Sequence, residues 1–260
     1  MNRITTFDIA TISVLIRRDL KRFFRQKSRV AGALIQPLLF WLILGTGFGR
    51  SFQHSLSSPV SFLEFFYPGI IAMIVLFTSI FATMSVIEDR NEGFLQGVLT
   101  APSSRASLVL GKTLAGSLLA FIQVLLFLLF LPLAGIHFFE VNFASLFIII
   151  FLTAFFLNAF GFFLAWWLNS VQGYHVMMSV LLMPLWLLSG AVFPLENSSR
   201  LLRFIASLNP LTYAVEGIRK SFYGGKLPHS SAFILQMGII LVMCLITYYL
   251  ALYQTQKKAV

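Results

Sequence analysis

Long apolar runs, separated by short polar segments, dominate the pattern along this chain. An α-helix needs about 20 mostly apolar residues to cross a hydrocarbon layer of about 30 Å. Runs of this kind, without Asp, Glu, Lys or Arg, cover residues 30–49, 66–87, 113–134, 143–168, 174–195 and 233–253. We therefore predict an all-α integral membrane protein with six transmembrane helices, forming one transmembrane domain over residues 1–260.

Composition supports this fold class and narrows the chemistry. Hydrophobic residues make up 58% of the chain and charged residues only 11%, whereas soluble domains carry about 25% charged residues. Ion-coupled carriers and intramembrane hydrolases need titratable groups at membrane depth, and the predicted spans hold no Asp, Glu, Lys or Arg. Cys244 is the only cysteine, so neither an intrachain disulfide nor a thiolate metal cluster is expected. We predict no catalytic residues, metal or cofactor in this chain.

The segment before the first span is basic and amphipathic. Its apolar positions share one helical face: Ile9, Ile12, Ile16, Leu20, Phe23 and Phe24. The opposite side carries Arg17, Arg18, Lys21, Arg22 and Arg25. Residues 1–29 therefore predict an interfacial helix, its apolar face toward the membrane and its basic face toward lipid phosphates or a cytosolic partner. A simple topology anchor is the alternative. Although the net charge is +10, this placement favours membrane lipids over nucleic acid as the partner.

The distribution of basic residues predicts the topology. With six spans, thirteen Lys and Arg residues fall on the side of the N-terminus and six on the other side. Basic residues accumulate on the cytoplasmic side, so both termini are expected in the cytoplasm.

The segment 88–112, between the second and third predicted spans, has an apolar helical face of its own. Phe94, Leu95, Val98 and Leu99 lie on this face, and Pro102 ends the helix. An exposed apolar patch favours a partner protein, and the flanking Glu88, Asp89, Arg90 and Glu92 would orient it. A helix folded beneath its own bundle is the alternative.

The chain contains a near match to a nucleotide-binding loop just before the third predicted span. Residues 106–113 fit G-x-x-x-x-G-K-[ST] except at the first glycine, and no buried strand precedes them, as such a loop requires. The chain therefore shows no energy source of its own.

Two further sets of residues are candidates for function. Residues 197–222 predict two short amphipathic helices, broken at Asn209-Pro210 and partly embedded in the membrane. There, Glu216 and Arg219 lie three residues apart and predict a charge pair. Uncharged polar residues also occur within the spans, and they predict interhelical hydrogen bonds or, alternatively, substrate contacts: Gln36, Gln123, Asn158 and Gln236.

Three stretches resemble the ABC-2 type permease family, the membrane subunits of bacterial ABC exporters. They are the acidic-to-glycine loop ending in Gly111-Lys112, LLSGAVFPLE at 187–196, and NPLTYAVEGIRKSFYGG at 209–225. The resemblance implies that residues 92–102 are a coupling helix that docks into a cytosolic ATPase, through Glu92, Phe94, Leu95, Val98 and Leu99. It also implies outer gate helices at 197–222, with Asn209, Pro210, Tyr213, Glu216 and Arg219 in the gate.

The resemblance further implies the other subunits of the complex. The complete exporter would contain two ATPase subunits, which carry ATP and Mg²⁺. It would also contain a second permease subunit, expected to be a second copy of this chain. The complex would lie in a bacterial cytoplasmic membrane. The aromatic-rich, charge-free spans favour a hydrophobic or amphiphilic cargo such as a drug or lipid. Export of a polysaccharide or lipid-linked glycan is one alternative, and a non-transporting membrane scaffold is an alternative of a different class.

Overall fold

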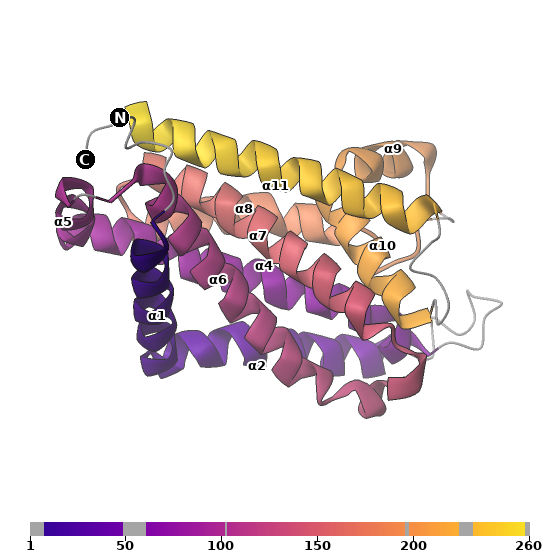
Figure 1. Cartoon of the computed structure of the whole chain (residues 1–260). Helices are drawn as coiled ribbons and strands as arrows, with labels where there is room; N and C mark the ends of the chain where they lie inside the picture. Colours follow the sequence, from indigo (N-terminus) through magenta and orange to yellow (C-terminus); the bar gives the residue numbers. More distant parts are fainter. Residues whose placement is uncertain (1–7, 49–60, 102, 196–197, 224–230, 258–260) are drawn as a thin grey trace.

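The structure is a computed structural model that describes residues 8–48, 61–101, 103–195, 198–223 and 231–257. Within these ranges every regular element is helical, as the sequence predicts (Figure 1). The longer elements are α1 Ile9–Arg25, α2 Lys27–Gly47, α4 Phe62–Asn91, α6 Arg105–Leu128, α7 Phe143–Trp167, α8 Val171–Leu187 and α11 Ser231–Lys257. The shorter ones are α5 Phe94–Thr100, α9 Arg200–Leu208, α10 Pro210–Tyr223 and the two 3-10 turns η1 Leu131–Ala134 and η2 Phe138–Glu140.

Five described helices are long and apolar enough to cross a membrane, rather than the expected six. They contain the stretches Val30–Gly47, Phe62–Asn91, Arg105–Leu128, Phe143–Trp167 and Phe233–Lys257. The fifth predicted span, 174–195, overlaps α8, which has 17 residues and ends at Leu187. The backbone then turns, and Gly190 adopts a positive φ of 79°, a conformation that interrupts a helix. The apolar run continues beyond the helix because Ser189, Gly190 and Ala191 are buried and residues 192–195 are partly buried.

Helix α4 is the centre of the bundle. It contacts α2, α5, α6, α7, α8 and α10, and residues 66–76 are buried without interruption. A helix that is apolar on all sides is expected in such a central position. The other elements are therefore arranged around α4, and a movement of α4 would displace most of them.

Uncharged polar side chains of α4 bond to three of its neighbours. Thr78 donates to Gln123 of α6, and Asn158 of α7 donates to Ser79 across 2.9 Å. Thr83 lies 2.5 Å from the hydroxyl of Tyr174 on α8. Such bonds join helices in a lipid environment, where no water competes for them.

Small residues set the closest approaches. A Cβ at Gly116 on α6 would lie 1.9 Å from Oδ1 of Asn158 on α7. A Cβ at Gly69 on α4 would lie 2.6 Å from the carbonyl oxygen of Ala191. These glycines are required for the backbones to pack as closely as they do.

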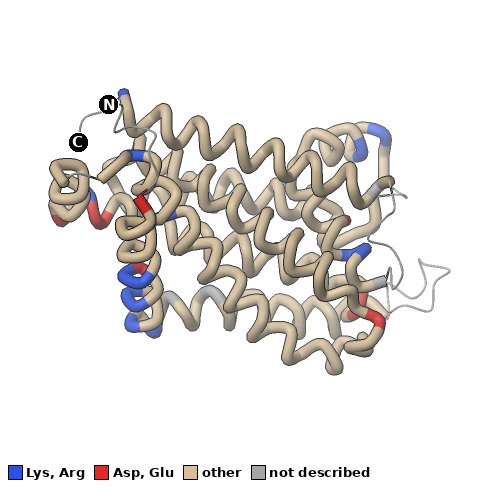
Figure 2. The backbone as a smooth tube through the Cα atoms, in the orientation of Figure 1, with Lys and Arg blue, Asp and Glu red and all other residues tan. Residues whose placement is uncertain are grey.

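The two ends of the bundle differ. Helix α1 crosses one end at a steep angle to the long helices, and the start of α1 and the end of α11 lie at this same end (Figure 1). Helices α9 and α10 lie at the opposite end. Charged residues gather at both ends and leave the middle of the bundle uncharged (Figure 2). The arrangement is that of a membrane protein with polar ends.

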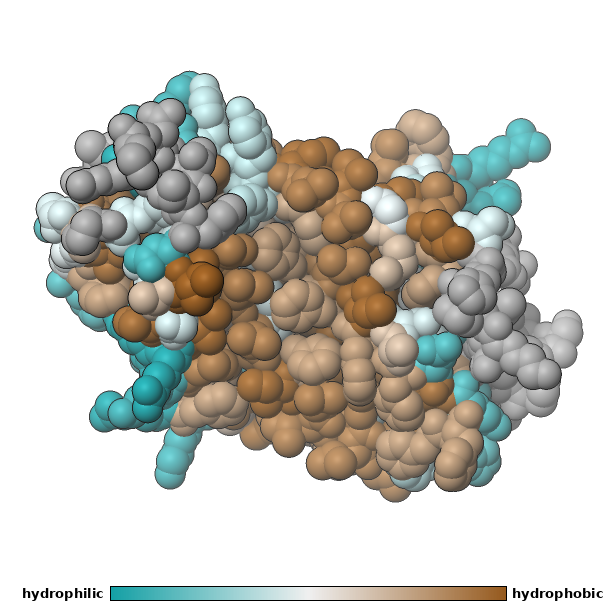
Figure 3. Space-filling view, in the orientation of Figure 1, coloured by the Kyte–Doolittle hydropathy of each residue, from teal (hydrophilic) through white to brown (hydrophobic). Residues whose placement is uncertain are grey.

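The middle of the visible face is a broad apolar band (Figure 3). Exposed apolar residues of α2 and α11 are prominent in the structure, among them Ile43 and Leu245, which are each about two-thirds exposed. Surface of this extent has to be covered by lipid or by another protein.

Candidate functional site

The charged end of the bundle is built on a close approach of α1 to α6. At Gly111 a Cβ would lie 3.0 Å from the Leu15 side chain and 3.4 Å from the Cα of Ile12. Leu15, Asp19 and Phe23 form the buried face of α1. Gly111 thus lets α1 lie against the beginning of α6, and this contact brings Asp19 next to Lys112.

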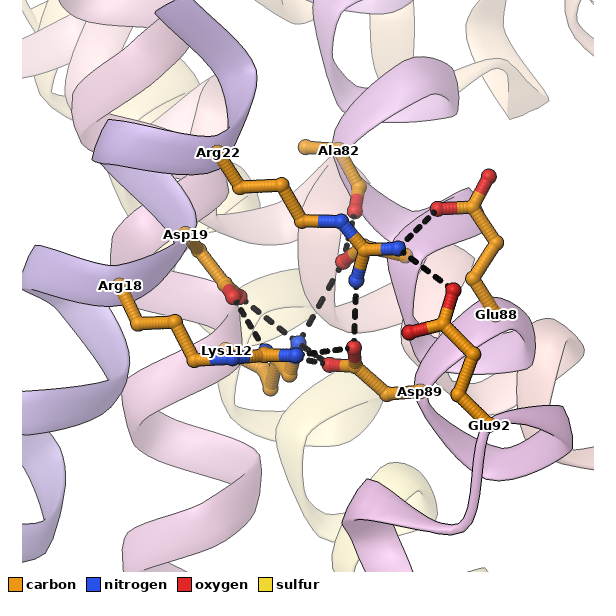
Figure 4. A network of polar contacts seen from close by, with 9 residues as sticks. Arg18, Asp19, Arg22, Ala82, Glu88, Asp89, Glu92 and Lys112 are labelled. Atoms are coloured by element: carbon orange, nitrogen blue, oxygen red, sulfur yellow. Dashed lines mark hydrogen bonds and ion pairs between the residues drawn. The ribbon is translucent and has the colours of Figure 1, made fainter. Parts of the chain in front are cut away.

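Seven charged residues from α1, α4, the turn after α4, and α6 form one cluster centred on Asp89 (Figure 4). The Arg18 guanidinium donates two hydrogen bonds to the Asp89 carboxylate, at 2.8 and 2.6 Å, and Arg22 donates a third at 2.5 Å. Lys112 forms ion pairs with both Asp89 and Asp19, the latter at 2.8 Å. Arg22 also pairs with Glu88 and Glu92, each at 3.1 Å. We call these residues the charge cluster: Arg18, Asp19, Arg22, Glu88, Asp89, Glu92 and Lys112.

Burial makes the charge cluster energetically important. The side chain of Asp89 is fully buried and that of Lys112 is 2% exposed. A buried charge is tolerated only when it is paired and hydrogen-bonded, and here each has at least two opposite partners. The bonds to Asp89 raise the pKa of the Arg18 guanidinium above its ordinary value. The paired bonds therefore fix Asp89 and Lys112 in position.

The charge cluster also positions α5. Gly93, with a φ of 79°, forms the turn between the end of α4 and the start of α5. The Arg18 guanidinium lies 3.6 Å from the centre of the Phe94 ring, and Glu92 pairs with Arg22 immediately before the turn. Cation–π contacts and ion pairs thus join α5 to α1 as well as to α4.

The apolar face of α5 does not form an exposed patch, which corrects one expectation. Leu95 is fully buried against its own bundle, and Phe94, Val98 and Leu99 are partly buried against the same core. The exposed residues of α5 are Gln96, Gly97 and Thr100. The apolar spacing indicated the helix correctly but pointed to the side that faces the chain itself. Pro102, the expected helix terminator, lies outside the described residues.

Arg90 secures the other side of the same end. It donates to the Trp166 carbonyl at 2.9 Å and to the carbonyl of Leu168, both at the end of α7. Arg90 and the charge cluster therefore hold the last turn of α4 from two sides.

At the opposite end, Asn209 and Pro210 set the start of α10. The Asn209 side chain accepts from the Leu211 N–H at 3.0 Å and donates to the Leu185 carbonyl of α8 at 2.5 Å. Asparagine is a favourable N-cap and proline a favourable first residue of a helix. As expected, two helices meet at this point; residue 197, where they were expected to begin, lies outside the described residues.

The two helices at this end differ in burial. Four apolar residues of α9 are exposed, namely Leu201, Phe204, Ile205 and Leu208, whereas Val215, Ile218 and Phe222 of α10 are fully buried. Tyr213 joins the two helices by donating to the Ser207 carbonyl at 2.6 Å. Helix α10 therefore belongs to the bundle, and α9 presents an apolar face outward.

Glu216 and Arg219 of α10 both contact other elements. Glu216 accepts from Gln236 of α11 at 2.6 Å. Arg219 donates to the Gly190 carbonyl at 2.9 Å and lies 4.4 Å from the centre of the Phe65 ring. These contacts connect α10 to α4, to α11 and to the turn after α8. Each charge therefore has a structural role of its own, and the mutual pair stays a prediction.

The four polar residues predicted within the spans divide into two groups. Gln123, Asn158 and Gln236 are buried and bond to neighbouring helices. Gln36 lies on the partly exposed side of α2, in an apolar groove that also includes Gly32, Ile35 and Phe40. In this conformation the first three connect helices, and only Gln36 faces a groove.

Sequence reasoning missed Asp19, Lys112 and the pairing of Asp89 with Arg18. The available signal was Asp19, the single acidic residue among the basic residues of α1. The other signal was Lys112, which lies about two turns inside an apolar helix. A charge in such a place requires a partner, but the sequence does not say which one.

The fold and the charge distribution define a helical membrane protein with a partly buried cluster of paired charges at one end. Comparison with known proteins identifies its family: residues 10–223 match the ABC-2 type transporter family, and the chain belongs to it. A relative from Cyanophora paradoxa, named "Putative transport permease ycf38", is 33% identical over 217 residues, which are 82% of this chain and 74% of the relative. One of the same name from Porphyra purpurea is 28% identical over 213 residues, 81% of this chain and 73% of the relative.

Proposed function

We propose that this protein is the permease subunit of an ABC exporter and that a separate cytosolic ATPase drives it through α5. The observation that carries the proposal is the position of α5. It follows directly on the central helix α4 and is fixed to α1, α4 and α6 through the charge cluster. A push on α5 would therefore reach the centre of the bundle. Membership of the ABC-2 type family supports an ABC ATPase as the source of that push.

The remaining parts of the machine follow from the same proposal. Two ATPase subunits supply ATP and Mg²⁺, and two copies of this chain form the pathway in a bacterial cytoplasmic membrane. Their α1 ends face the cytoplasm, in keeping with the excess of basic residues there. The exposed apolar faces of α2 and α11 supply surface for lipid and for the second copy. The uncharged middle of the bundle favours a hydrophobic or amphiphilic cargo.

Gly97 offers a test that leaves the permease fold intact. It lies on the exposed side of α5, and a Cβ added there meets nothing within 4 Å. Gly97→Trp places a large side chain on the proposed docking surface without disturbing the buried Leu95. We expect normal membrane insertion, loss of the ABC ATPase that co-purifies with the wild type, and loss of ATP-dependent export.

Gly238→Trp is the matched control, because Gly238 is exposed on α11 and also has open space around it. This variant should retain the ATPase. If Gly97→Trp retains both the ATPase and export, α5 is not the docking helix. If no ABC ATPase co-purifies even with the wild-type protein, that result supports the interpretation as a non-transporting scaffold instead.

A further inference from the structure

The charge cluster divides the basic residues of α1 into two groups. Arg18 and Arg22 turn toward Asp89, Glu88 and Glu92, so their charges are compensated within the chain. Arg17, Lys21 and Arg25 are exposed. Spaced four residues apart, these three form one stripe along the helix.

The surroundings of the stripe lack the acidic groups that could neutralise it. Among the described residues, each carboxylate of the charge cluster pairs with Arg18, Arg22 or Lys112. A shallow, open groove of about 810 Å³ runs along this side of α1 and is lined by Val14, Arg17, Arg18, Lys21, Arg22, Arg25 and Gln26. The three cations of the stripe make this groove positive, so it suits an anion.

The position of α1 indicates where the anion comes from. The helix lies across the end of the long helices (Figure 1), as a helix at a membrane surface does. Exposed apolar side chains lie beside the stripe: Val14, which also lines the groove, is 63% exposed and Phe24 is 44% exposed. A site with cations above apolar side chains matches a phospholipid, whose phosphate lies above its acyl chains.

We propose that Arg17, Lys21 and Arg25 form a binding site for the headgroups of anionic phospholipids. The arginines can bond phosphate oxygens in pairs, and Lys21 adds a point charge. Because Arg18 and Arg22, on the adjacent side of α1, join the helix to α4 and α5, an occupied site fixes the helix that positions α5. The inference rests on the proposed function only in placing this end at the cytoplasmic leaflet. The lipid-binding test involves neither ATP nor cargo, so this inference and the proposed function can be refuted independently.

Native mass spectrometry of the delipidated full chain can measure this binding. Phosphatidylglycerol and phosphatidylcholine with identical acyl chains are titrated separately. The wild type should bind phosphatidylglycerol in preference, and Arg17→Gln/Lys21→Gln should lower that preference at least about tenfold, since each surface cation contributes about 1 kcal/mol. Arg200→Gln/Arg203→Gln removes two exposed cations from the opposite end and should leave the preference unchanged. Arg17→Lys/Arg25→Lys should retain most of it.

Three outcomes would overturn the proposal. The first is equal binding of the two lipids by the wild type. The second is displacement of phosphatidylglycerol by millimolar inorganic phosphate, which would indicate a site for a free anion. The third is an unchanged lipid preference in Arg17→Gln/Lys21→Gln together with loss of the co-purifying ATPase, which would assign the stripe to a protein partner. Identical size-exclusion profiles of all variants ensure that the comparison concerns folded protein.

Discussion

Asp89 is the residue on which the charge cluster depends, because it accepts from Arg18, Arg22 and Lys112 together. Asp89→Ala would leave the buried Lys112 and two arginines without their shared carboxylate. Removing one partner of a buried ion pair costs about 3–5 kcal/mol. We expect a clear fall in the unfolding temperature of the purified permease in detergent.

Glu92→Ala is the control for this change. The Glu92 side chain is 60% exposed, and exposed ion pairs contribute at most about 1 kcal/mol. Equal destabilisation by the two variants would mean that burial of the cluster contributes nothing.

Gly116 gives a second test, of packing rather than charge. In Gly116→Ala the new methyl group would displace Asn158 and break its bond to Ser79. Overpacking of this kind costs about 1–3 kcal/mol, and thermal unfolding in detergent measures it. Gly238→Ala, in open space on α11, should be neutral; a neutral Gly116→Ala would show that α6 and α7 can move apart freely.

The sequence indicates these residues only in part. That Asn158 and Gln123 would bond between helices could be predicted from polar residues inside apolar runs. Their partners could not, because the spacing along one helix says nothing about the rotation of the next. The same reason explains Leu95: an apolar face needs covering, and the sequence cannot say whether the cover is the chain itself or another protein.

At the scale of the helices, Asn209 controls how α10 enters the bundle. Asn209→Ala removes both the N-cap bond and the bond to the Leu185 carbonyl. We expect a loss of about 1–2 kcal/mol, together with reduced export, because α10 packs against α4, α7 and α11. Asn209→Asp keeps the cap acceptor but not the donor and should be intermediate.

Ser199→Ala provides the comparison. Ser199 caps α9 in the same way, but α9 is largely exposed and its loss should disturb the bundle little. If Ser199→Ala is as harmful as Asn209→Ala, the two short helices contribute equally, and the distinction drawn from their burial is wrong.

Most helices could be predicted because apolar length is a strong signal. Helix α4 contains the predicted span 66–87 and continues to Asn91. Helix α6 begins at Arg105, before the predicted span 113–134, and ends within it at Leu128. A search for uncharged runs ends a predicted span at the first charged residue. The helix itself continues past a charged residue that is paired with an opposite charge. Helix α8 shows the opposite case: it is shorter than the apolar run that predicted it, because the chain turns at Gly190.

For the whole molecule, the structure makes topology testable from both ends at once. The beginning of α1 and the end of α11 lie at one end of the bundle. Cysteines placed at Ser13 and at Gln256, in a Cys244→Ala background, should react with an impermeant thiol reagent only from the cytoplasmic side, and one at Ser199 only from outside. Reaction of Ser13 and Gln256 variants from opposite sides would contradict the arrangement.

The charge cluster also has a consequence for the order in which the protein is made. Arg18 and Asp89 are 71 residues apart in the chain, and at about 5–20 residues per second their synthesis is separated by about 4–14 s. Lys112 emerges later still. During that interval Arg18 has only Asp19 as an acceptor and Arg22 lacks Asp89, so α1 is not yet fixed to the rest of the bundle. Its final position is reached when the ribosome delivers α6, and a pause or truncation before Lys112 should leave a nascent chain that is inserted but not yet assembled.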